Sequence, residues 1–139
     1  MIVKVKKLHS HAVIPKYAKE GDAGLDLTCV SVSRDNFGNL AYDTGLSFEI
    51  PKGFVGLLFP RSSISKKQLA LTNCVGVIDS GYRGSVMMKF KVQGDGMIYT
   101  VGERIGQLII MPYPEVKLVE SDALSETERG AGGYGSTGQ

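Results

Sequence analysis

The stretch LSFEIPKGFVGLLF, residues 46–59, decides the fold class of this chain. Its first five residues alternate apolar and polar side chains, which is the period of a strand with one buried face. Pro51, Lys52 and Gly53 then supply the residues of a tight turn. Residues 54–59 follow as a dense apolar run, which is typical of a strand buried on both sides. The stretch therefore indicates a protein made of short strands joined by turns.

The same signals recur on either side of this stretch. Apolar and polar residues alternate at 3–6 and at 86–92, and residues 105–111 form a second dense apolar run. Turn-forming residues at 35–39 read as a hairpin tip, and those at 94–96 read as a tight turn. Many short strands with regular turns are typical of a β-sandwich, a jelly roll or a closed barrel.

Helical periodicity is nearly absent, and residues 63–69 are the one candidate helix. After Leu124 the composition becomes polar and rich in glycine, with Tyr134 as the only large side chain. Such a segment buries too little apolar surface to order itself. We therefore predict two parts, a β-barrel domain at residues 1–124 and a flexible C-terminal tail at residues 125–139.

Length and composition exclude several classes of protein. The chain has 139 residues, 42% of them apolar, and a net charge of +2, which fits one domain with its own core and predicts neither a nucleic-acid nor a membrane partner. No apolar run has the length of a signal peptide core or a membrane span, so we expect a protein of the cytoplasm, or of the host-cell cytoplasm if viral. Cys29 and Cys74 show no metal-site spacing and are expected to be buried small side chains.

Five short segments carry side chains that could do chemistry, and two of them suit an anion and its counter-ion. In residues 21–27, Asp26 either belongs to a turn before a strand or holds a hydrated Mg²⁺. In residues 60–63, Arg61 offers a planar fork for phosphate oxygens, and the two serines beside it complete an anion cradle. The alternative is that Ser62 or Ser63 caps a short helix.

The third and fourth segments each place one polar side chain in apolar surroundings. Asp79, within residues 73–84, either orients an attacking water as a general base or forms a structural ion pair with Arg83. Gln107, within residues 102–108, either faces outward or bonds a phosphate through its amide.

The fifth segment, residues 129–138, has the ingredients of a phosphate loop: glycines, a serine, a threonine and one arginine. It is not a Walker A motif, because it lacks the Gly-Lys-Ser/Thr ending and no strand precedes it. A linker is the alternative, but Arg129 and Tyr134 in a Gly-Ser-Thr frame favour a function.

Taken in order, the five segments resemble the five motifs of the trimeric dUTPases. The matching residues are AGLDL at 23–27, PRSS at 60–63, GVID at 76–79 with YRG at 82–84, ERIGQ at 103–107, and RG at 129–130 with GGYGSTG at 132–138. The resemblance implies an all-β, distorted jelly-roll β-barrel, assembled as a homotrimer with three active sites at subunit interfaces. It further implies hydrolysis of dUTP to dUMP and pyrophosphate with Mg²⁺, which keeps uracil out of DNA and supplies dUMP for thymidylate synthesis.

The resemblance also assigns roles by position. Asp79 would orient the water that attacks the α-phosphorus, and Asp26 would hold Mg²⁺ through its waters. Tyr82 would pack under the deoxyribose, and Tyr134 would stack on the base. The other substrate-binding positions are Arg61, Ser62, Ser63 and Gln107 for the phosphates, Asn73, Gly76, Val77, Ile78 and Met87 for uracil, and Arg129, Gly135, Ser136 and Thr137 in the closing tail.

Three positions depart from the commonest family pattern, and two other functions stay open. Tyr134 stands where Phe is usual, Ser63 where Gly is frequent and Gly106 where Ala is frequent, but none removes a required group. The dCTP deaminases share this fold but need a glutamate near the pyrimidine, which residues 73–84 lack. A regulatory binding protein on the same scaffold is the other alternative.

Overall fold

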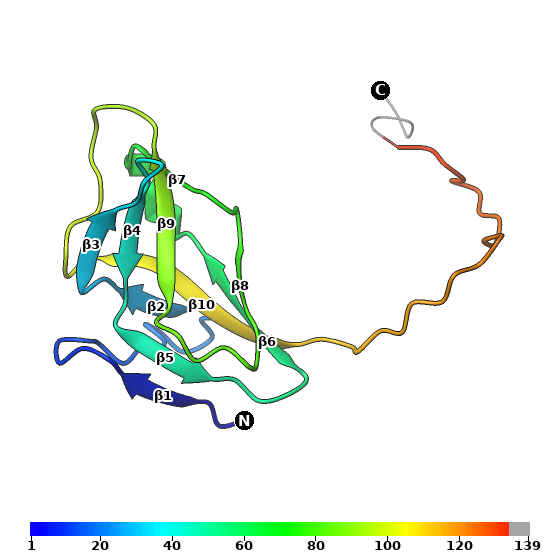
Figure 1. The fold of residues 1–139 in the computed structure, drawn as a ribbon, viewed down its shortest axis with the longest axis horizontal. Helices are drawn as coiled ribbons and strands as arrows, with labels where there is room; N and C mark the ends of the chain where they lie inside the picture. The colour runs from blue at the N-terminus through cyan, green and yellow to red at the C-terminus, as the bar shows by residue number, and fades with distance from the viewer. Residues whose placement is uncertain (134–139) are drawn as a thin grey trace.

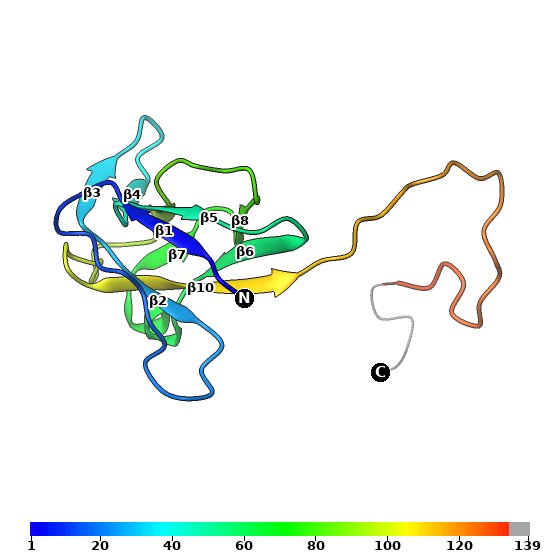
Figure 2. The ribbon, with the colours of Figure 1, turned by 90° about the horizontal axis from the view of Figure 1, so that it is seen from below.

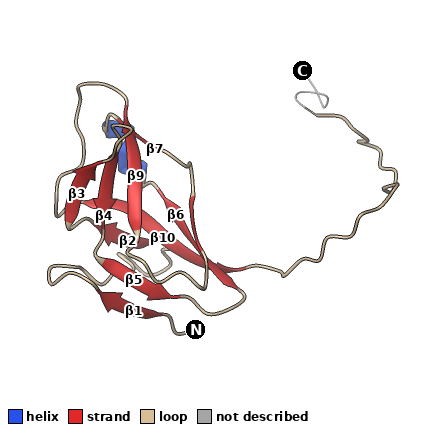
Figure 3. Cartoon of the chain, viewed as in Figure 1, coloured by secondary structure: helices blue, strands red, loops and turns tan. Residues whose placement is uncertain are grey.

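The computed structural model describes residues 1–133, and strands make up nearly all of its regular structure (Figures 1 and 3). This confirms the all-β prediction. In the described residues the elements are β1 (Lys4–Lys7), β2 (Leu25–Thr28), β3 (Ser31–Arg34), β4 (Leu40–Asp43), β5 (Leu46–Glu49), β6 (Phe54–Phe59), the 3₁₀ helix η1 (Ser62–Lys66), β7 (Leu69–Leu71), β8 (Gly76–Ile78), β9 (Met87–Val92) and β10 (Arg104–Pro112).

Two four-stranded antiparallel sheets form the body of the molecule. One has the order β2-β10-β6-β8 and the other β3-β4-β9-β7, while β1 and β5 form a separate two-stranded ladder. Leu27 and Leu108 from the first sheet and Tyr42 and Phe90 from the second belong to one buried cluster. Two sheets around a shared core give the jelly-roll fold that the sequence predicted.

Alternation along the strands sets which side chains enter this core. In β9, Met88 and Phe90 are buried, whereas Met87, Lys89 and Lys91 face outward. At the centre, the rings of Tyr42, Phe90 and Tyr99 meet edge to face, with centroids 5.7 to 6.0 Å apart. The hydroxyl of Tyr42 donates to the carbonyl of Tyr99 at 2.9 Å, so its polar end is satisfied inside the core.

The predicted hairpin at 35–39 is confirmed, because it joins the paired strands β3 and β4. Its tip is held by Asp35, whose carboxylate accepts hydrogen bonds from the backbone N–H groups of Phe37 and Asn39. Gly38 takes a φ of +82°, which a residue with a Cβ rarely adopts.

Three expectations differ from the structure. The predicted helix at 63–69 is instead the shorter η1, because Lys67 is extended and the N–H of Gln68 donates to the carbonyl of Met97. Residues 54–59 and 105–111 are buried on one face but only partly covered on the other in the single chain. Cys29 is buried as expected, but Cys74 is exposed, because it lies in the turn after β7 with a φ of +60°.

The chain leaves the barrel at the end of β10 (Figures 1 and 2). Residues 113–133 carry no strand, and the departure begins before the change of composition at Leu124. Four large apolar side chains of this arm are largely exposed in the single chain: Val116, Leu118, Val119 and Leu124. In residues 1–133 no helix is long and apolar enough to cross a membrane.

Candidate active site

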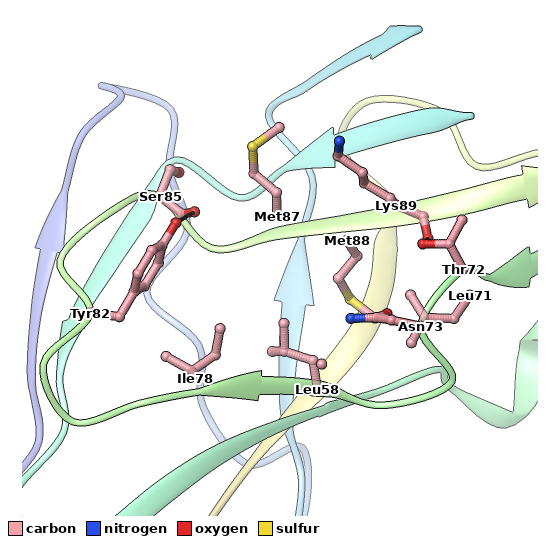
Figure 4. Close-up of a pocket in the computed structure, with 11 residues that line it drawn as sticks. Leu58, Leu71, Thr72, Asn73, Ile78, Tyr82, Ser85, Met87, Met88 and Lys89 are labelled. Atoms are coloured by element: carbon pink, nitrogen blue, oxygen red, sulfur yellow. Dashed lines mark hydrogen bonds between the residues drawn. The ribbon is translucent and has the colours of Figure 1, made fainter. Parts of the chain in front are cut away.

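One pocket, here called the hairpin pocket, lies between β8 of one sheet and β9 of the other (Figure 4). Its volume of about 340 Å³ falls within the range of small-molecule sites. Leu58 and Ile78 point into it from one sheet, and Tyr82 stands at one end. Its lining residues are Leu58, Leu71, Thr72, Asn73, Gly76, Ile78, Tyr82, Ser85, Met87, Met88 and Lys89.

Two glycines shape this pocket by letting other groups approach closely. A Cβ on Gly76 would lie 2.9 Å from the Cβ of Leu58, so only glycine lets β8 pack this closely on β6. A Cβ on Gly84 would lie 2.6 Å from Cζ of Tyr82, so the ring occupies space that a side chain would fill. The hydroxyl of Tyr82 donates to the carbonyl of Ser85 at 3.1 Å and fixes the ring at the pocket end.

The structure thus brings together four of the residues predicted for uracil, Asn73, Gly76, Ile78 and Met87, with Tyr82, which was predicted for the deoxyribose. Val77 and Asp79 are not among the lining residues, and Val77 is 61% exposed. Asp79 directly follows β8 and is exposed. The alternative ion pair with Arg83 is wrong, because Arg83 donates to the carbonyls of Ser80 and Tyr82 and forms no salt bridge with Asp79.

A second pocket, here called the arginine pocket, joins three segments that are distant in sequence. Its volume is about 270 Å³, and it shares no lining residue with the hairpin pocket of the same chain. It gathers the predicted phosphate and metal residues Asp26, Arg61, Ser62 and Gln107, and its other lining residues are Ala18, Asp22, Ala23 and Gly24.

Hydrogen bonds fix the polar groups of the arginine pocket. The Nε of Arg61 donates to Oδ1 of Asp26 at 2.8 Å, and Nη1 of Arg61 lies 3.5 Å from the hydroxyl of Ser63. The amide of Gln107 donates to the carbonyl of Pro60 at 3.1 Å, so Gln107 faces the pocket segment rather than simply outward. A Cβ on Gly24 would lie 3.0 Å from Cδ of Gln107, which explains the small residue at that position.

The capping alternative for the serines is wrong. Arg61 occupies the N-cap position of η1, and no side chain caps that helix. The Oγ of Ser62 and the Oγ of Ser63 are therefore not used to hold the helix end.

The carboxylate of Asp26 has acceptor positions that the water shell of a metal ion could use. In residues 1–133 no three His, Cys, Asp or Glu side chains come together. Asp26 accepts a second hydrogen bond, from Nη1 of Arg104 to Oδ2 at 2.8 Å, so both oxygens are engaged. A carboxylate has about four acceptor positions, so it can still accept from the water shell of Mg²⁺. Sequence reasoning missed Arg104, although a charge near the start of an otherwise apolar strand was visible.

The described tail residues, 125–133, line neither of the two pockets. Arg129 is on the arm beyond β10, and its Nε donates to the carbonyl of Gly132 at 3.0 Å. Tyr134, Gly135, Ser136 and Thr137 lie outside the described residues.

Fold and pockets together define a class: a small jelly-roll protein with one pocket between its two sheets and another lined by an arginine and two aspartates. The dUTPase family model matches residues 10–138 of the chain. This chain is 39% identical over 142 residues to the deoxyuridine 5'-triphosphate nucleotidohydrolase of a Hydrogenobaculum species. It is also 39% identical over 141 residues to the enzyme of the same name from Crocosphaera subtropica, and in both comparisons 99% of each chain is covered. The chain belongs to the dUTPase family.

Solved structures agree with this assignment. The dUTPase of Staphylococcus bacteriophage 80alpha with dUpNHpp matches with a TM-score of 0.83 at 27% identity over 99% of both chains. A variant of the same phage enzyme, also with dUpNHpp, matches with a TM-score of 0.85 at the same identity and coverage.

Proposed function

We propose that this chain hydrolyses dUTP to dUMP and pyrophosphate at sites shared between the subunits of a homotrimer. The proposal of a site shared between subunits rests on the separation of the two pockets within one chain. One chain holds its ring site and its anion site in pockets without a common residue. A nucleotide needs both sites together, and a neighbouring copy can supply the second one.

The hairpin pocket suits uracil and deoxyribose. β8 is an edge strand of its sheet, so the backbone groups on its outer side are not paired with another strand of residues 1–133. These groups and the amide of Asn73 can bond the base edge. Cytosine would present a donor where uracil has an acceptor, and a buried mismatch of this kind can cost ~10⁴-fold in kcat/KM. Tyr82 would lie against the 2′-carbon of the deoxyribose and leave no room for the 2′-hydroxyl of a ribose.

The arginine pocket suits the phosphate chain. Arg61 supplies a cation whose Nη1 makes one long contact, 3.5 Å to Ser63, and Ser62 and Gln107 add neutral donors. Ser63 does not line the pocket but would add its hydroxyl through this contact. Asp26 would hold Mg²⁺ through its waters, and the bound ion would offset part of the triphosphate charge.

Asp79 is the proposed general base. It directly follows Ile78, which lines the hairpin pocket, and it has no ion-pair partner in the described residues. A carboxylate there can accept a proton from water as that water attacks the α-phosphorus. Pyrophosphate leaves, and the proton stays on Asp79 until it is released to solvent.

Exposed apolar surface supports the assembly. The outer faces of β6 and β10 are only partly covered, and the arm at 113–124 exposes five large hydrophobic side chains, those of Tyr113, Val116, Leu118, Val119 and Leu124. Large apolar side chains exposed in this number are consistent with surface that a neighbouring subunit covers. Residues 125–139 would then reach a third subunit, where Arg129, Tyr134, Gly135, Ser136 and Thr137 close over the bound nucleotide.

One assay separates this function from its rivals: release of pyrophosphate from dUTP, dCTP and dTTP with Mg²⁺. The proposal expects release from dUTP alone. Ammonia release from dCTP would identify a deaminase, and no turnover of any nucleotide would leave a binding protein. Sedimentation of the same sample tests the assembly, and an active monomer near 15.0 kDa would refute the shared site.

A further inference from the structure

Arg104 is a charged residue beside the arginine pocket, and the proposed function does not use it. It bonds Asp26 but does not line the pocket. We infer that Arg104 is a positioning residue, which acts through Asp26 to hold the guanidinium of Arg61 toward the triphosphate. The inference rests on the proposed function, because it assumes that Arg61 binds phosphate.

The contacts form a chain of three side chains. Oδ1 of Asp26 accepts from Nε of Arg61 at 2.8 Å, and Oδ2 accepts from Nη1 of Arg104 at 2.8 Å. Asp26, in the middle of this chain, has the least exposed side chain at 19%, while Arg61 is 26% exposed and Arg104 is 53% exposed. Asp26 and Arg61 line the pocket, whereas Arg104 closes the far side of the carboxylate.

This arrangement leaves the phosphate-binding end of Arg61 free. Asp26 takes only Nε, and the terminal Nη1 has one long contact, 3.5 Å to Ser63. If Oδ2 were also free, Asp26 could form the side-on bidentate pair that arginine and carboxylate favour. That pair would use a terminal nitrogen of Arg61 and turn the fork away from the substrate. Arg104 disfavours this pair, because its Nη1 takes one acceptor position of Oδ2 and places a second cation beside it.

A break in strand regularity places Arg104 there. Arg104 and Gln107 are three residues apart, so in a regular strand their side chains would point to opposite faces. The pairing of β10 with β2 shifts register between Arg104 and Gly106, and the consecutive residues Ile105 and Gly106 are both buried. This bulge lets Arg104 bond Asp26 while Gln107 bonds Pro60, so both act on the arginine pocket.

A double-mutant cycle on the full-length protein tests the inference. The variants are Arg104→Gln, Arg61→Gln and the double substitution, with Arg34→Gln as a control that removes an exposed arginine bonded only to Gly38 of the β3–β4 hairpin. At saturating Mg²⁺, Arg104→Gln is expected to lower kcat/KM for dUTP by about tenfold. In the Arg61→Gln background, Arg104→Gln should lower kcat/KM by less than about twofold, because no guanidinium remains at position 61 to be positioned. The control should resemble the parent.

Two further measurements keep the outcome clear. Deoxyuridine has no phosphate, so its affinity should stay within about twofold of the parent in every variant. The affinity for dUpNHpp should show the same coupling between Arg104 and Arg61 as kcat/KM does. This binding measurement tests the role of Arg104 even if the parent releases no pyrophosphate. Absence of pyrophosphate release would contradict the proposed function but not the inference about Arg104. If Arg104→Gln fails to fold, Arg104→Lys retains one donor to Asp26 and is compared in both backgrounds.

If Arg104→Gln lowers kcat/KM by the same factor with and without Arg61, the inference is overturned, because Arg104 would then act independently of Arg61. A parent-like kcat/KM in Arg104→Gln would overturn it as well.

Discussion

Gly106→Ala tests the packing of β10 against the core next to the arginine pocket. The added Cβ would lie 2.5 Å from Cε of Met88 and 3.0 Å from the carbonyl oxygen of Phe59. Carbon atoms pack best at 3.5–4.0 Å, so the end of Met88 must retreat by about 1 Å or more. Met88 is 1% exposed and surrounded by core side chains, so little free space receives it.

Overpacking of this kind typically costs ~1–3 kcal/mol of unfolding free energy. For a chain of this length each kcal/mol shifts Tm by roughly 3–5 °C, so Gly106→Ala should lower Tm by roughly 3–15 °C. Because Gly106 precedes Gln107, a smaller loss in kcat/KM for dUTP should accompany the shift.

Met88→Val provides the matched rescue, because it shortens the side chain that the new methyl group meets. Thermal unfolding by circular dichroism compares the parent, both single variants and the double variant. We expect Gly106→Ala to lower Tm much less in the Met88→Val background than in the parent. Equal decreases in both backgrounds, or a parent-like Tm for Gly106→Ala, would show that Met88 does not set the space at this glycine.

Three further predictions concern the base, the tail and one ion pair. Asp79→Asn should lower kcat by about 10² or more while the trimer sediments unchanged, and parent-like turnover would mean that another group is the base. Truncation before Arg129 should lower kcat far more than Tm, because the described part of the tail makes only local contacts; a fully active truncated protein would contradict closure by the tail. Hydrogen bonds from the N–H of Thr100 and, to a smaller extent, from Lys67 hold the pKa of Glu103 below its ordinary value of 4.5. The Glu103 carboxylate therefore stabilises the fold above pH 4.5, and this stabilisation is lost as the pH falls through the lowered pKa. Glu103→Gln should therefore lower Tm at pH 7, with a difference that narrows in acid; a constant difference from pH 7 to about pH 3 would refute this.

The sequence by itself determined the strands and the family. The side-chain period of a strand is a local property, so residues 86–92 identified the inward face of β9, with Met88 and Phe90 buried. Turn chemistry is equally local, which is why the hairpin at 35–39 was predictable from five residues. The order of the five motifs then indicated the dUTPase family, to which the comparisons assign the chain.

Local propensity failed where long-range contacts decide the conformation. Residues 63–69 formed only a 3₁₀ turn before the chain became extended, because Gln68 bonds Met97 and Lys67 bonds Glu103. Cys74 was expected inside because cysteine is usually buried, but its place in the turn after β7 leaves it exposed.

Only the tertiary structure decided how the site is divided and held. Asp26 and Arg104 are 78 positions apart, and their contact depends on a bulge that no sequence period reveals. The separation of the hairpin pocket from the arginine pocket likewise follows from strand order, because β8 with Ile78 and β2 with Asp26 lie at opposite edges of the sheet β2-β10-β6-β8. Motif order lists the groups that bind a nucleotide, but their distances depend on strand register and sheet packing, which arise from contacts across the whole chain.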